Sequence, residues 1–240
     1  MNHELNIEEI DHDGALRESA EEAMQDTRLS FLKKAGVGAA GLASSGAILG
    51  ALGTSEAIAA SKGSHDRPPS FFGKGDFGIL NYAFTLELLE QAFYNEATRN
   101  NVAASDPKTN TFLQVVTADE NKHVAALRSA LGSKNVFRKA APKFNFGNST
   151  RDLGTFQQTA YALEKTGTGA YPGQAPNIKS AKILLVALSI VTIEARHTGA
   201  IASITGNPIA PNPFDLPVGY KGTKKAVTGT GFLVSPKKLP

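Results

Sequence analysis

Apolar residues recur at intervals of three and four along four stretches of the chain, which is the pattern of helices that bury one face. The four predicted helices span about residues 76–100, 107–132, 151–166 and 179–204. Asp76 is the expected N-cap of the first helix, Gly167 is expected to end the third, and Gly206 to end the fourth. Four such helices can bury their apolar stripes against one another, so the sequence predicts an all-α four-helix bundle over residues 75–206.

The segments around these helices differ in composition. Residues 137–149, between the second and third helices, are rich in basic and aromatic side chains, and we expect them to form a long, extended crossover. Residues 207–240 are rich in Pro, Gly and Lys and show no convincing period, so they are predicted to form an irregular tail that wraps the bundle. Residues 60–74 are polar and are predicted to be a linker.

The first 59 residues are predicted to be an export signal. A Gly/Ala-rich apolar run at residues 35–52 follows basic residues and precedes the small-residue site Ala57-Ile58-Ala59, an order typical of a secretory signal that is cleaved near Ala59. Residues 27–33 are similar to a twin-arginine signal, but Leu29 replaces the second arginine. We therefore expect a periplasmic or extracellular protein whose mature form has no membrane span. The alternative is an uncleaved anchor, although five glycines make this run a poor spanning helix.

Composition excludes several kinds of chemistry. The chain has no cysteine, so disulfides, zinc–thiolate sites, iron–sulfur clusters and thiol nucleophiles are ruled out. Residues 1–26 contain nine acids and one base, whereas residues 60–240 contain 21 bases and 12 acids. These bases are scattered and are not interleaved with aromatic residues, so we expect a solvated basic surface and no nucleic-acid partner.

The motif Glu-x-x-His occurs twice, as Glu120 with His123 in the second predicted helix and as Glu194 with His197 in the fourth. Residues three apart lie on one face of a helix, so each motif directs a carboxylate and an imidazole to the same place. One such pair often arises by chance. Two pairs carry more weight because the other two predicted helices each place a glutamate on the apolar stripe.

Carboxylates at the centre of apolar stripes are costly to bury unless they are paired or bind a cation. From residue 60 onward the chain has six glutamates and three histidines, and four of those glutamates and two of the histidines fall on the stripes. The expected cofactors are two iron or two manganese ions. The predicted metal ligands are Glu87, Glu120, His123, Glu164, Glu194 and His197.

Two assignments in the first predicted helix are open. Glu90 also lies near the stripe and competes with Glu87 as the ligand. Glu87 is preferred because Tyr94 lies seven residues further on, two turns along the same face. Tyr94 is the candidate catalytic residue, but it could equally be an ordinary core aromatic residue. The same two interpretations apply to Tyr161, which lies one turn before Glu164.

With these residues the chain resembles the ferritin-like superfamily, and more narrowly the ferritin-like domain family of bacteria, fungi and plants that includes the plant desiccation-related proteins. The resemblance covers about residues 75–218. It rests on the segments 79–87 and 92–94, on Glu120 with His123, on 162–164, 169–171 and Gly173, on 193–197, and on Pro213-Phe214-Asp215. It implies a four-helix bundle with a two-metal centre, and it does not imply storage of iron.

A centre of this kind implies oxidation of ferrous iron, or consumption of peroxide or dioxygen, in stress defence, with Glu120 and Glu194 bridging the two ions. The alternative is a non-catalytic stress or structural protein of the envelope that retains the bundle, and its basic exterior would suit anionic polymers there. Iron and manganese accept the same six ligands. The sequence leaves open which metal binds and whether the protein forms a homodimer.

Overall fold

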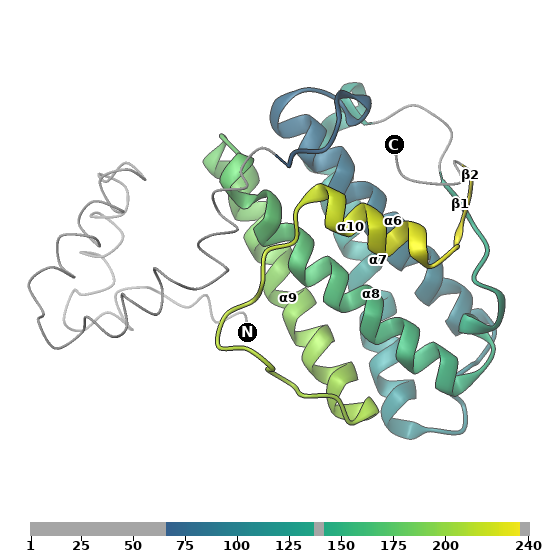
Figure 1. The fold of residues 1–240 in the computed structure, drawn as a ribbon. Coiled ribbons are helices and arrows are strands. Elements are labelled where there is room, and N and C mark those ends of the chain that lie inside the picture. Colours follow the sequence, from purple (N-terminus) through teal and green to yellow (C-terminus); the bar gives the residue numbers. More distant parts are fainter. Residues whose placement is uncertain (1–65, 137–141, 236–240) are drawn as a thin grey trace, which may run out of the picture. The chain divides into compact units, whose positions relative to one another are not determined.

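The computed structural model describes residues 66–136 and 142–235 (Figure 1). The predicted export signal and residues 60–65 of the predicted linker lie outside the described residues. The elements, in chain order, are η1 (Ser70–Phe72), α6 (Gly75–Arg99), α7 (Pro107–Asn135), β1 (Lys143–Phe144), η2 (Gly147–Thr150), α8 (Leu153–Gln174), η3 (Ala175–Asn177), α9 (Ala181–Thr205), α10 (Tyr220–Gly229) and β2 (Leu233–Ser235).

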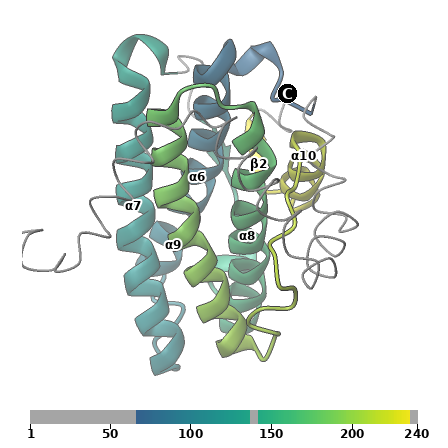
Figure 2. The ribbon, with the colours of Figure 1, turned by 90° about the vertical axis from the view of Figure 1, so that its left-hand side faces the viewer.

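Four long helices, α6 to α9, stand side by side and form the predicted all-α bundle (Figure 2). Helix α6 packs mainly on α7 and α8 mainly on α9, while α7 also contacts α9 and α6 also contacts α8. Side-chain caps fix where two of these helices begin, because Asp106 accepts a hydrogen bond from the Thr109 amide at 2.7 Å and Asp152 accepts one from the Thr155 amide at 2.8 Å.

Asp76 differs from its predicted role as an N-cap. It lies inside the first turn of α6, and its carboxylate accepts hydrogen bonds from the backbone amides of Lys179 and Ser180. These amides lie at the start of α9, whose own cap is Ser180. Asp76 therefore ties the N-terminal ends of α6 and α9 together instead of starting α6.

The predicted crossover between the second and third helices is described from residue 142 onward, and its residues 137–141 lie outside the described residues. At one end of the bundle, the side chain of Asn81, near the start of α6, donates to the carbonyl of Asn135 at the end of α7. At the other end, the side chain of Asn100, just after α6, donates to the carbonyl of Thr150 shortly before α8. The end of α7 and the start of α8 therefore lie at opposite ends of α6, and α6 and α8 are antiparallel.

The third helix does not end at Gly167 as predicted, because α8 continues to Gln174. The glycines in this stretch make room for neighbouring groups. A Cβ on Gly167 would lie 3.0 Å from Oε2 of Glu194, and one on Gly173 would lie 2.0 Å from the carbonyl oxygen of Val218. Glycine signals the end of a helix only where the backbone turns away, and here it permits close packing instead.

The prediction of a wholly irregular tail is wrong, because residues 220–229 form α10. Tyr220, Thr223 and Val227 are buried at helical spacing, and the lysines between them concealed this short apolar face in the sequence. After α10 the chain forms β2, which pairs antiparallel with β1 of the crossover. The described part of the tail therefore packs on the bundle through α10, and its last strand pairs with the crossover.

In the part of the chain that the structure describes, α9 is the one helix long and apolar enough to cross a membrane by length and composition. Helix α9 also carries the buried side chains of Glu194 and His197. Its composition therefore suits a core helix of the bundle equally well.

Candidate metal centre

The structure brings all six predicted ligands together at mid-height in the bundle. All six side chains are buried, and those of Glu120, Glu164 and Glu194 have no exposed surface. The ligand atoms form two groups, in each of which one atom per residue lies within 4.8 Å of the others. One group is Glu87, Glu120, His123 and Glu194, and the other is Glu120, Glu164, Glu194 and His197. We call these the His123 position and the His197 position. They share Glu120 and Glu194, as expected of bridging carboxylates.

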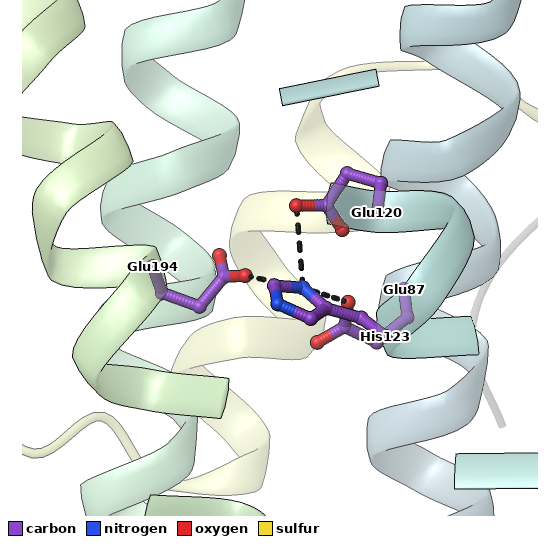
Figure 3. Close-up of side chains that lie close together, drawn as sticks. All are labelled: Glu87, Glu120, His123 and Glu194. Carbon is purple, nitrogen blue, oxygen red and sulfur yellow. Dashed lines mark ion pairs between the residues drawn. The ribbon is translucent and has the colours of Figure 1, made fainter. Parts of the chain in front are cut away.

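Carboxylates surround Nδ1 of each imidazole. At the His123 position, Nδ1 of His123 lies 3.0 Å from Glu194, 3.3 Å from Glu87 and 3.4 Å from Glu120 (Figure 3). At the His197 position, Nδ1 of His197 lies 3.4 Å from Glu164 and 3.5 Å from Glu120. Three or more potential ligands thus point at one place from different helices in each position.

These atoms are close together but are not hydrogen-bonded to each other. Among the described residues, both oxygens of Glu120, both oxygens of Glu194 and Nδ1 of each histidine are buried without a partner in hydrogen-bond geometry. A buried polar atom without a partner costs about 1–3 kcal/mol, and more if it is charged. Carboxylate oxygens and imidazole nitrogens converging in this way match the donor set that iron and manganese accept, so the residues fit such ions.

The protonation of the cluster reflects crowding of negative charge. Burial disfavours the imidazolium of His123, but contacts with Glu120, Glu194 and Glu87 outweigh it and raise the pKa of His123 to about 12. In the same way, the carboxylates of Glu120 and Glu164 raise the pKa of His197 to about 11 against the effect of burial.

The carboxyls respond to burial and to one another. Burial and the charge of Glu87 raise the pKa of Glu120 to about 7. Burial and the charges of neighbouring carboxylates raise the pKa values of Glu90 and Glu194 well above the usual range. Burial would also raise the pKa of Glu87, yet the contact with His123 lowers it. Without metal ions the cluster therefore retains protons, and bound cations would replace them.

Apolar side chains close the centre from both ends of the bundle. Toward one end lie Phe93, Phe112, Phe156 and Ile201, and toward the other lie Leu80, Phe84, Leu127 and Ile190, all of them buried. The centre is thus a polar layer between two apolar layers, where electrostatic interactions are stronger than in water.

Two tyrosines donate hydrogen bonds to the carboxylates, and sequence reasoning found only one of them. The phenol of Tyr94 donates to Oε1 of Glu164, and the phenol of Tyr171 donates to Oε1 of Glu87 at 2.5 Å. Tyr171 was missed because the third helix was expected to end at Gly167. The available signal was that Tyr171 follows Glu164 by seven residues, just as Tyr94 follows Glu87.

Three residues whose roles the sequence left open have defined places in the structure. Tyr94 and Tyr171 bond the carboxylates, whereas the ring of Tyr161 is half-buried and lies 5.7 Å from the Nζ of Lys165. Glu87 belongs to the His123 position. Glu90 is buried as well, with 3% of its surface exposed, although it belongs to neither position.

Asp119 is a further residue that sequence reasoning missed. Its Oδ2 lies 3.4 Å from Nε2 of His197, on the opposite side of the ring from Nδ1. A carboxylate in this place can hold the proton on Nε2 and direct the lone pair of Nδ1 toward a metal. Asp119 directly precedes Glu120, whereas Ile193 occupies the corresponding place before Glu194.

A buried pair of Glu-x-x-His motifs with two further glutamates, in a four-helix bundle with a long crossover, defines the class of ferritin-like carboxylate bundles. A sequence model of the ferritin-like domain family matches residues 75–207, and the chain therefore belongs to this family. A comparison with curated proteins gave no match.

Proposed function

We propose that the buried centre holds two iron or two manganese ions and uses them to oxidise ferrous iron or to consume peroxide or dioxygen. The observation that supports this most strongly is that the two positions share Glu120 and Glu194. Two ions bound side by side would supply electrons for reduction of dioxygen or peroxide. A single ion held for structural reasons would need only one position.

The side chains of this protein would perform three tasks in that chemistry. Nδ1 of His123 and His197 would bind the ions as neutral donors and limit the negative charge. The phenols of Tyr94 and Tyr171 donate to one oxygen of Glu164 and Glu87, respectively, so the other oxygen of each carboxylate would be available to hold an ion. The apolar layers exclude bulk water and so protect a reactive centre.

Tyr94 is the proposed catalytic residue, and it would hold and share a proton with the carboxylate of Glu164. Burial and the charge of Glu164 raise the pKa of Tyr94 well above the usual range, so the phenol keeps its proton. The Tyr94 proton lies on the hydrogen bond to Glu164, where it is placed to be shared with that carboxylate.

We also propose that the protein works outside the cytoplasm, in the periplasm or the extracellular space, in defence against oxidative stress. The support is the order of basic residues, apolar run and small-residue site in residues 1–59. A homodimer is compatible with this proposal.

The alternative is a non-catalytic protein of the envelope that keeps the bundle and binds anionic polymers. The excess of bases over acids in residues 60–240 favours it. Five of the twelve acids in that range are the buried glutamates 87, 90, 120, 164 and 194, so the exterior is more basic than the total suggests.

The test compares the wild-type protein with Glu120→Ala and with the control Gln114→Ala, whose side chain is exposed on the same helix. After anaerobic loading with iron or manganese, we expect oxidation of ferrous iron or consumption of peroxide by the wild type and by Gln114→Ala. Glu120→Ala should lose the activity. Equal activity in all three proteins, or no activity in a metal-loaded wild type, would favour the non-catalytic alternative.

A further inference from the structure

Helices α6 and α8 carry matching residues at matching positions. Glu87 on α6 corresponds to Glu164 on α8, and Tyr94 corresponds to Tyr171 at the same spacing of seven. Each tyrosine bonds the glutamate of the other helix, so the two halves of the centre are related by an approximate two-fold axis.

This symmetry fails three residues after each glutamate. Glu90 occupies that place on α6, and Gly167 occupies it on α8. The glycine leaves a space beside the centre, since a Cβ built on Gly167 would lie 3.2 Å from Oε1 of Glu90 and 3.0 Å from Oε2 of Glu194. The Glu90 carboxylate therefore lies next to the place where a side chain at position 167 would begin.

Among the described residues, two carboxylate oxygens beside this space lack hydrogen-bond donors. Oε2 of Glu90 and Oε2 of Glu194 are both buried and have no hydrogen-bond partner in the described part of the chain. The other oxygen of Glu194 lies against His123, so Oε2 is the one left for the α8 side of the centre. Two carboxylate groups that face one space without a donor need a cation to be stable there as anions.

We propose that Glu90 is a further ligand, for the ion at the His197 position, and that Gly167 keeps open the space through which the carboxylate reaches it. This inference rests on the proposed two-metal function. It makes the centre one of five carboxylates and two imidazoles, in which the His197 position carries the additional negative charge.

The additional charge has a consequence for the oxidation state. Two divalent ions are balanced by the four carboxylates of the symmetric set, whereas a fifth carboxylate balances one divalent and one trivalent ion. Glu90 therefore favours the oxidised form of the ion at the His197 position. Neutralising this residue should make that ion harder to oxidise.

The test is an anaerobic calorimetric titration, with Mn²⁺ and separately with Fe²⁺, of the wild type, Glu90→Gln and the control Glu96→Gln. Glutamine keeps the shape of Glu90 and removes the charge. Glu96 lies on the same helix, is partly exposed and bonds Thr150 away from the cluster, so its substitution removes a charge without touching the centre. We expect two ions in the wild type and in Glu96→Gln, and at least roughly tenfold weaker binding of one of the two ions in Glu90→Gln.

A second variant addresses the space itself. Gly167→Ala should reproduce the weakened binding of one ion, because the new methyl group displaces the Glu90 carboxylate, and combining it with Glu90→Gln should add little. Circular dichroism of each variant shows whether the bundle is intact.

The outcomes separate the two proposals. Two ions with unchanged affinities in Glu90→Gln would overturn the role of Glu90 and leave the two-metal function in place. The role of Glu90 would also be overturned if Gly167→Ala weakened metal binding and Glu90→Gln did not. The methyl group would then weaken binding by displacing Glu194. A wild type that binds no Mn²⁺ and no Fe²⁺ would overturn both.

Discussion

Tyr171 and Glu87 are 84 residues apart in the sequence, yet the phenol of one donates a hydrogen bond to the carboxylate of the other at 2.5 Å in the centre of the bundle. Tyr94 and Glu164 form the same bond in the opposite sense. The exchange is possible because α6 and α8 are antiparallel. The tyrosine two turns after the glutamate of one helix therefore lies level with the glutamate of the other helix. Each metal position therefore has its own tyrosine.

Removing one phenol should weaken one position only. In Tyr171→Phe, Oε1 of Glu87 loses its donor, and we expect about tenfold weaker Mn²⁺ binding at the His123 position with little change at the other. Tyr94→Phe should weaken the His197 position instead. Calorimetric titration measures both affinities, and Tyr161→Phe is the control because Tyr161 lies outside the cluster. Equal losses at both positions in Tyr171→Phe would contradict this division.

Asp119 should act through His197 alone. Asp119→Asn keeps the size of the side chain but removes the charge that holds the proton on Nε2, so we expect about tenfold weaker metal binding at the His197 position. Glu96→Gln is the control, because it removes the charge of a carboxylate that accepts a hydrogen bond from Thr150 away from the cluster. Mn²⁺ affinity in Asp119→Asn equal to that of the wild type would show that the 3.4 Å contact does not orient the imidazole.

The four helices and the six clustered residues could be predicted from the sequence because both depend on local periodicity. Charged residues on apolar stripes stand out, and two Glu-x-x-His motifs place them on separate helices. Helix α10 was missed because lysines interrupt its short apolar face. Tyr171 was missed for a different reason: Gly167 and Gly173 lie within α8, where Glu194 and Val218 pack closely against them. Local signals at a glycine cannot distinguish close packing from the end of a helix.

The stability of the metal-free protein should fall as the pH rises from about 5 to 8. The pKa of Glu120 is raised in the folded protein from 4.5 to about 7, so the folded state binds more protons than the unfolded state in that range. The pKa values of His123 and His197 are raised from 6.5 to about 12 and 11, and their contribution is complete below pH 6.5 and declines above it. The pKa of Glu87 is lowered, so its contribution to stability increases as the pH rises, but this change occurs below pH 4.5.

We expect the Tm of the metal-free protein to fall by about 5–10 °C over this pH range. Bound Mn²⁺ replaces the protons, so the loaded protein should show a smaller fall or none. Differential scanning calorimetry at about pH 5, 6.5 and 8 measures both forms. A Tm of the metal-free form that rises with pH would show that the cluster does not retain protons when it folds.

Close packing of the tail on α8 depends on Gly173. Its backbone is so near to Val218 that a Cβ would lie 2.0 Å from the carbonyl oxygen, and the Val218 amide donates to the carbonyl of Gly169 at 2.9 Å. Gly173→Ala should therefore displace the tail and destabilise the protein by roughly 1–3 kcal/mol. Thermal unfolding measures the loss, with Gly229→Ala as the control because a Cβ there meets nothing within 4 Å. Equal Tm values for Gly173→Ala and wild type would mean that the tail packs elsewhere.

If this bundle holds two metal ions in positions that share Glu120 and Glu194, the metal content of protein purified without added metal or chelator will show it. Elemental analysis should find close to two iron or manganese ions per chain in the wild type. Glu120→Ala should contain almost none, because the substitution removes a ligand from both positions. Glu164→Ala should retain about one, since the ligands around His123 remain. Wild-type protein that contains no more iron or manganese than Glu120→Ala would contradict the account.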